Sequence, residues 1–299
     1  MSDALQVALP APSLPLAAPT RSTKLQRVWR RWRNPIGLVG GAVILLTLLV
    51  AVCAPLIAPY EPSSQAHRRL LPPGAPYLMG TDELGRDTFS RIVFGARVSL
   101  QVGALAVAIA LVLGTTLGLL GGFYGGRLDD VLMRVVDIMF AFPGLVLAIV
   151  IAGLLGPSRT NAMLAIGVVY APAFARVVRG SVIAVMAEPY MESARVMGAS
   201  DWLAIRRYIL PNVMAPLIVM ISVYLSQAIL SEAALSLLGL GTQPPEPSWG
   251  GMLSAARAYM ELSPWMAIFP GAAIMVVVLG FNFLGDGLRD VLDPRLQSF

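Results

Sequence analysis

The chain has 299 residues, of which 57% are hydrophobic and only 13% are charged, and its mean hydropathy is +0.73. Soluble domains carry about a quarter charged residues, so this composition excludes an ordinary soluble domain and predicts a membrane protein. Six of the 22 Lys and Arg residues lie between Arg21 and Arg33, and arginines of alternate loops add to the same side. Positive charge stays on the cytoplasmic side, so the net charge of +5 predicts two cytoplasmic termini rather than nucleic-acid binding.

Apolar stretches long enough to cross a bilayer recur along the chain, since a span needs about 20 residues. Six are expected: 35–60, 98–126, 138–158, 160–175, 208–231 and 263–285. The fourth is short and is expected to continue beyond Arg176. It is separated from the third only by a turn at Gly156-Pro157-Ser158, and five spans result if that turn is absent. The fold class predicted is an all-α membrane protein with six transmembrane helices.

The chain divides into four segments. They are a disordered cytoplasmic tail (1–24), an anchor span with an external loop (25–97), a transmembrane domain (98–290) and a cytoplasmic C-terminal tail (291–299).

The external loop contains the stretch 80-GTDELGRDTFSRIVFGARVSL-100. Thr81 or Asp82 is expected to cap a short helix that lies on the membrane surface. Its arginines, Arg86, Arg91 and Arg97, are expected to face lipid headgroups or acidic side chains.

Small residues and prolines mark several spans. Gly114, Gly118 and Gly122 follow one another at intervals of one helical turn, which favours close packing of a second helix, in this chain or in another. Prolines inside spans remove backbone donors, so kinks are expected at Pro143, Pro172, Pro216 and Pro270.

Several enzyme classes are excluded by the residues that the sequence contains. The only histidine is His67, which excludes a zinc site of the His-Glu-x-x-His type, and no Gly-x-Ser-x-Gly elbow is present. The only lysine is Lys24, in Arg-Ser-Thr-Lys, so the chain has no phosphate-binding loop of an ATPase. The single cysteine, Cys53, excludes an internal disulfide. We expect no catalytic residues and no metal site.

Ionisable groups inside the bilayer are few. Asp137, Glu232 and Asp286 all fall near span ends, so the relay of an ion-coupled carrier is not visible. Glu232 has apolar residues on both sides and is a candidate for lining a substrate path or its outer gate; the alternative is a buried carboxylate that caps a helix or pairs with an arginine. An ion-coupled secondary transporter or channel is the alternative function.

One charged stretch, 190-YMESARVMGASDWLAIRRYILPNV-213, interrupts the apolar pattern. Pro189 suits the first turn of a helix, Gly198 suits a left-handed C-cap, and Ser200 or Asp201 can cap a second helix that continues into the fifth span. Tyr190, Met191, Ala194 and Met197 share one apolar face of the first helix, which predicts a rigid cytoplasmic knob that docks on a partner.

The knob resembles a known signature. Glu192-Ser193-Ala194, Gly198 and Leu210-Pro211 are similar to the Glu-Ala-Ala…Gly…Ile-x-Leu-Pro motif of bacterial ABC importer permeases, with Ser193 in place of an alanine and Tyr208 in place of the isoleucine. Three further stretches, 80–100, 231–253 and 283–296, resemble the dipeptide/oligopeptide/nickel group of these permeases, of the second-permease type. The resemblance covers the chain from about residue 30 onward.

The resemblance implies a type I importer permease fold in the bacterial inner membrane. It implies three kinds of partner besides lipid: a second homologous permease, two ATP-binding subunits that hold ATP and Mg, and an extracytoplasmic substrate-binding protein. It also implies a coupling helix at about 189–198, with docking or coupling residues Tyr190, Met191, Glu192, Ser193, Ala194, Arg195, Gly198, Leu210 and Pro211.

Overall fold

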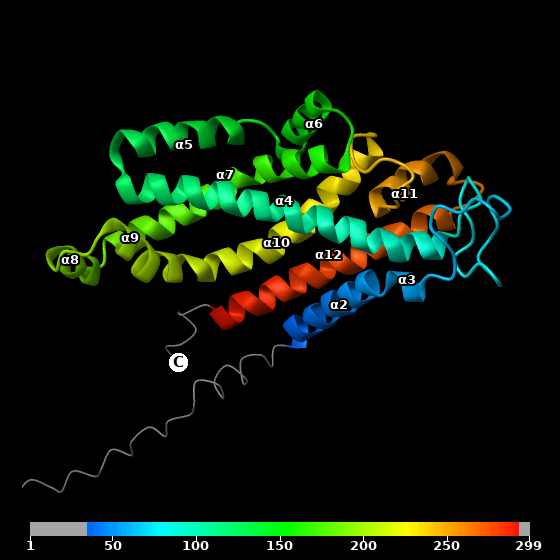
Figure 1. Cartoon of the computed structure of the whole chain (residues 1–299), viewed down its shortest axis with the longest axis horizontal. Helices are drawn as coiled ribbons and strands as arrows, with labels where there is room; N and C mark the ends of the chain where they lie inside the picture. The colour runs from blue at the N-terminus through cyan, green and yellow to red at the C-terminus, as the bar shows by residue number, and fades with distance from the viewer. Residues whose placement is uncertain (1–34, 293–299) are drawn as a thin grey trace, which may run out of the picture.

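The computed structural model describes residues 35–292, so the predicted tails at 1–24 and nearly all of 291–299 lie outside the described residues. The described part is an elongated bundle of helices (Figure 1). In chain order they are α2 (Pro35–Val52), α3 (Ala54–Ile57), α4 (Thr88–Tyr124), α5 (Gly126–Phe140), α6 (Gly144–Leu155), α7 (Arg159–Met186), α8 (Pro189–Val196), α9 (Asp201–Ala204), the π-helical turn η1 (Ile205–Ile209), α10 (Leu210–Leu237), α11 (Trp249–Ala256), the 3-10 turn η2 (Arg257–Tyr259) and α12 (Trp265–Leu292).

Five helices of the described chain are long and apolar enough to cross a membrane: α2, α4, α7, α12 and the continuous helix made by α9, η1 and α10. The bent pair α5–α6 supplies a sixth crossing if it counts as one span. The all-helical prediction is therefore confirmed. The start of α2 and the end of α12 point toward the end of the bundle that carries α8, which places both described ends on one side of the membrane (Figure 1).

The third predicted span, 138–158, is wrong as a single helix. The chain forms α5, breaks at residues 141–143, and continues as α6 at an angle of 93°. Pro143 is the residue just before α6. Because proline has no N–H, it cannot donate the hydrogen bond that would continue α5 through this position. The predicted turn at Gly156-Pro157-Ser158 is confirmed, because Ser158 caps α7 by accepting a hydrogen bond from the N–H of Asn161.

The predicted surface helix in the external loop is also wrong, because its residues are the first turns of α4. Neither Thr81 nor Asp82 caps this helix; Asp87 does, accepting a hydrogen bond from the N–H of Ser90 at 2.7 Å. Arg97, expected at the lipid surface, donates instead to the carbonyls of Ala51 and Val52 at the end of α2. The helix continues into the membrane because its arginines have protein partners.

The glycine stripe of α4 packs against α7. The second helix that the stripe predicts therefore belongs to this chain and not to another. A Cβ at Gly114 would lie 2.5 Å from the Cβ of Phe174, and one at Gly118 would lie 2.7 Å from the Cβ of Val178. Such distances leave no room for a side chain, so glycine is what allows the two backbones to approach.

A second glycine contact attaches α2 to the bundle. Cβ atoms placed on Gly37 or Gly287 would come within 2.8 Å and 2.5 Å of the opposite Cα, so α2 and α12 touch backbone to backbone. The opposite face of α2 is exposed, with Leu45, Leu46 and Leu49 each more than half exposed, as suits a helix that faces lipid.

Ion pairs fasten α5 to α7. Arg179 donates two hydrogen bonds to Asp129, at 2.6 and 2.5 Å, and Arg176 donates to Asp137 at 2.8 Å. The guanidinium of Arg176 also lies 4.3 Å from the ring centroid of Phe140. Asp137, a candidate for ion coupling in the sequence, is therefore paired with an arginine.

We expect Gly118→Ala to destabilise the protein by about 1–3 kcal/mol, because the added methyl would overlap the backbone of α7. The matched control is Gly180→Ala in α7, where a Cβ meets nothing within 4 Å and should be neutral or stabilising. Thermal aggregation of the detergent-solubilised protein measures both, and equal midpoints for the two variants would contradict the packing argument.

Candidate functional site

The charged stretch forms a short helix, a sharp turn and a returning helix at one end of the bundle (Figure 1). Pro189 is the first residue of α8, as the sequence predicts. Gly198 has φ +80°, and its N–H donates to the carbonyl of Arg195, while the N–H of Ala199 donates to the carbonyl of Ala194. This pair of bonds ends a helix with a left-handed residue. Ser200 then caps α9 by accepting from the N–H of Leu203 at 3.4 Å.

The apolar face predicted for α8 is divided between two environments. Met191 and Ala194 are buried, with 1% and 2% exposure, and Met191 belongs to the same core cluster as Ile209 of η1. The ring of Tyr190 lies 6.0 Å from that of Tyr208. The prediction that all four apolar residues face a partner is therefore wrong for Met191 and Ala194, which hold the knob against its own chain.

The surface that the knob presents consists of other residues. Val196, Met197 and Trp202 are 84%, 78% and 69% exposed, and Glu192 and Arg195 are exposed beside them. Large apolar side chains at the tip of the bundle have no partner in the described chain. An exposed apolar cluster with charges at its rim is typical of a protein interaction site.

A continuous helix connects the knob to the interior. Pro211 lies at the start of α10. It has no N–H, so it cannot donate the usual helical hydrogen bond to the carbonyl four residues earlier. The preceding turn is π-helical, and the N–H of Leu210 donates to the carbonyl of Ile205 instead. Leu210 and Pro211, predicted as part of the signature, thus lie where this turn joins α10.

Glu232 lies near the opposite end of α10 and is 1% exposed. Its Oε1 accepts hydrogen bonds from Ser236 at 2.8 Å and Thr242 at 3.4 Å, and a Cβ on Gly250 of α11 would lie 3.1 Å from Oε2. The carboxylate is therefore covered by α11. A role for Glu232 in the substrate path stays a prediction, and contact with substrate would require α11 to move.

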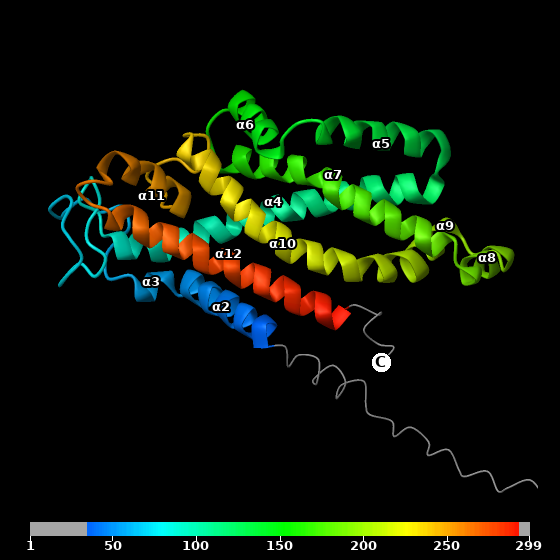
Figure 2. The same ribbon diagram turned by 180° about the vertical axis from the view of Figure 1, so that it is seen from behind.

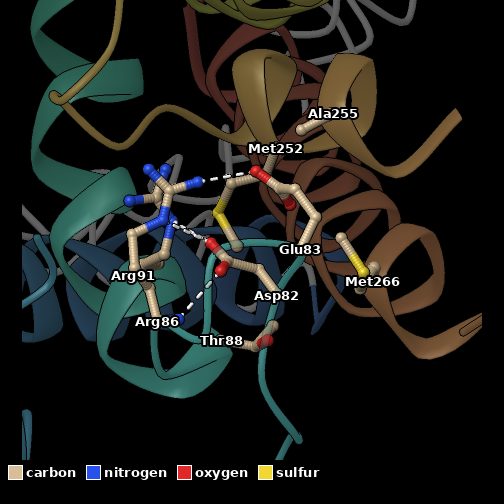
Figure 3. Close-up of a pocket in the computed structure, with 8 residues that line it drawn as sticks. All are labelled: Asp82, Glu83, Arg86, Thr88, Arg91, Met252, Ala255 and Met266. Atoms are coloured by element: carbon tan, nitrogen blue, oxygen red, sulfur yellow. Dashed lines mark hydrogen bonds and ion pairs between the residues drawn. The ribbon is translucent and has the colours of Figure 1, made fainter. Parts of the chain in front are cut away.

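A cluster of four charged side chains lies at this same end of the bundle, where the loop before α4 meets α11 and α12 (Figure 3). Arg86 pairs with Asp82 at 2.6 Å and with Glu83 at 2.8 Å, and Arg91 lies 3.4 Å from Asp82. All four side chains are at most 15% exposed. Acidic partners for Arg86 and Arg91 were one of the two environments expected from the sequence, but the burial of the group was not expected.

Comparison with known proteins identifies the family. Residues 110–298 match the family described as the inner membrane component of binding-protein-dependent transport systems, and residues 23–73 match the N-terminal transmembrane domain of oligopeptide transport permease C. The chain belongs to this family of permeases. It is a multi-pass inner-membrane protein and a non-catalytic transport subunit, with ATP bound by separate subunits. This membership excludes the alternative of an ion-coupled carrier or channel.

Relatives similar over most of their length include a dipeptide transport system permease, DppC, of Alkalihalophilus pseudofirmus, which is 47% identical over 89% of this chain and 88% of its own. A glutathione transport system permease, GsiD, of Pectobacterium atrosepticum is 43% identical over 92% and 93%. Among solved structures, an inward-facing MetNI methionine ABC transporter matches with TM-score 0.55 and 18% identity, over 69% of this permease and 97% of that chain. The last similarity supports the fold.

Replacing Arg86 with methionine should destabilise the permease by about 3 kcal/mol, because two buried carboxylates lose their shared partner. Arg159→Met is the control, since Arg159 pairs with Glu246 at 34% and 50% side-chain exposure, and such pairs contribute about 0–1 kcal/mol. Thermal unfolding in detergent compares the two variants. If Arg86→Met lowers the unfolding temperature no more than Arg159→Met does, burial does not strengthen the ion pairs of the cluster.

Proposed function

We propose that the permease forms half of the translocation pathway of an ATP-driven importer and that α8 is its coupling helix. The other half is a second, homologous permease. Two ATP-binding subunits lie at the end that carries α8, and a substrate-binding protein docks at the end that carries α11.

The observation that carries this proposal is the exposed knob. Val196, Met197 and Trp202 present apolar surface at the cytoplasmic end, where lipid cannot cover it. The left-handed residue at Gly198 and the buried side chain of Met191 fix α8 relative to the returning helix. A rigid, apolar knob of this kind fits a groove in a partner subunit, and an ATP-binding subunit is the partner that this family requires.

We propose short peptides as the substrates. The relatives named above transport dipeptides and glutathione, and a further relative, a di/tripeptide transport system permease of Pseudomonas aeruginosa, is 44% identical over 92% of this chain. These substrates share a peptide backbone and differ in side chains. A shared backbone is therefore the feature that we expect this permease to accept.

Coupling requires that ATP binding favours one conformation of the membrane helices. A ligand shifts a two-state equilibrium only through its different affinities for the two states. ATP would close the ATP-binding subunits, and the knob would pass that closure to the membrane because it is fixed to the helix that becomes α10. Glu192 and Arg195, which are exposed on α8, would set the orientation of the knob in its groove.

Glu192→Lys should weaken recovery of the ATP-binding subunits in a pull-down of the solubilised complex, because it reverses an exposed charge on the docking surface. Glu261→Lys reverses a charge that is also exposed, at the opposite end, and is the control. We expect the second permease to be recovered with both variants. Undiminished ATPase recovery with Glu192→Lys would remove α8 as the docking helix.

Gly198→Val should uncouple ATP hydrolysis from uptake while the protein stays in the membrane. A β-branched residue is strained at φ +80°, although no atom lies within 4 Å of the position that its Cβ would take. Gly198→Asn is the control, since asparagine tolerates this conformation. Uptake and ATPase activity are measured together in proteoliposomes, and coupled transport by the valine variant would contradict a rigid turn.

A further inference from the structure

One face of α10 carries neutral polar side chains inside the membrane. Tyr224, Gln227 and Ser231 follow one another at three- and four-residue intervals, so they lie along the same side of the helix. Tyr170 of α7 joins them: its hydroxyl and that of Ser231 are hydrogen-bonded at 2.8 Å, and its ring lies 4.9 Å from that of Tyr224. We call these four residues the hydroxyl–amide patch.

The patch is separate from the contact that holds α10 to α12. That contact uses Ser226, whose hydroxyl donates to Asn282 at 2.9 Å, and Ser222, which lies against Gly285. The neighbouring surface of α10 is exposed, with Val223 and Leu230 at 39% and 43%. In Figure 2 the side opposite α4 is formed by α7, α10 and α12, and α10 crosses in front of α4.

Gln227 distinguishes this face from one that contacts lipid. Its side chain is exposed, and it makes no hydrogen bond with any residue between 35 and 292. It lies ten residues before the end of α10, about 15 Å along the helix, and within the apolar stretch 208–231 that is expected to cross the membrane. An unpaired amide is costly in hydrocarbon, so Gln227 must face either protein or a water-filled path.

The chemistry of the patch fits a peptide bond. The Gln227 amide offers both a donor and an acceptor, as a peptide group does, and the hydroxyls of Tyr170 and Ser231 add groups that can do either. None of the four side chains carries a charge at neutral pH, so the patch would not select particular termini or charged side chains. The aromatic rings of Tyr170 and Tyr224 provide apolar surface beside it.

We propose that the hydroxyl–amide patch binds the backbone of the peptide as it crosses the membrane. The inference rests on the proposed function, because it assumes that peptides are the substrate. It goes further in assigning the contact to Gln227, with Tyr170 and Ser231 as its polar neighbours, and in choosing the peptide group rather than the side chains as the part that is recognised.

The test uses the complete transporter in proteoliposomes with its binding protein, ATP and a dipeptide. In a Cys53→Ser background, Gln227→Cys is exposed to a small, water-soluble methanethiosulfonate reagent. We expect the thiol to react, and to react at least threefold more slowly while dipeptide is being transported. Leu46→Cys on α2, which is 63% exposed, is the lipid-facing control and should not react.

Uptake by the parent protein gives a second readout. Gln227→Leu should lower the rate of dipeptide uptake about fivefold to tenfold, as expected for one lost hydrogen bond, with the subunits still copurifying. Gln227→Asn should recover part of the rate, and Leu230→Met, one turn away on the same exposed surface, should leave it unchanged.

Each contrary result has a distinct meaning. The inference is overturned if the Gln227→Cys thiol is unreactive, or if it reacts equally fast with and without dipeptide. The proposed function still stands in that case, provided that the parent transporter takes up dipeptide. Loss of the second permease from the Gln227→Leu complex assigns Gln227 to the contact between permeases and also overturns the inference. A parent transporter that takes up no peptide overturns the proposed function and the inference with it.

Discussion

The close approach of α4 and α7 is the constraint on which the rest of the structure depends. Gly114 and Gly118 let the two backbones touch, so side chains such as Phe174 and Val178 fill the space that would otherwise separate the helices. In lipid, helices gain little from hydrophobic burial, and association depends on such packing. Every other element attaches to this pair or to a helix that packs on it.

Charge is distributed according to what each region must do. At the end that carries α11, Asp82 and Arg86 are buried and paired, and Arg91 ties Asp82 to the first turns of α4. At the opposite end, Glu192 is exposed and free to meet a partner. Between them, the α10 face near Gln227 is polar but neutral. Uncharged groups can bind a passing solute in a low-dielectric setting without the desolvation cost of a charge.

The sequence predicts best what depends on neighbours along the chain. The roles of Pro189 and Gly198 follow from local backbone rules, and the structure has both as expected. The break between α5 and α6 is different, because the apolar pattern is continuous through Pro143 and hides it. The burial of Met191 depends on α8 joining the core formed by helices distant in the sequence, which no local pattern reports. Gln227 carries no ionisable group, so the rarity of charge within the spans does not point to it.

The knob and the hydroxyl–amide patch belong to one mechanical element. α9, η1 and α10 form a continuous helix of 37 residues, about 55 Å long, with Gly198 just before its start and Gln227 in its far half. A movement imposed on α8 must therefore either reach the patch as a displacement of α10 or be absorbed at the π-helical turn of η1. α10 also packs on α4, where a Cβ at Gly103 would lie 3.2 Å from the side chain of Ile229, so a displacement of α10 would act directly on the α4–α7 pair.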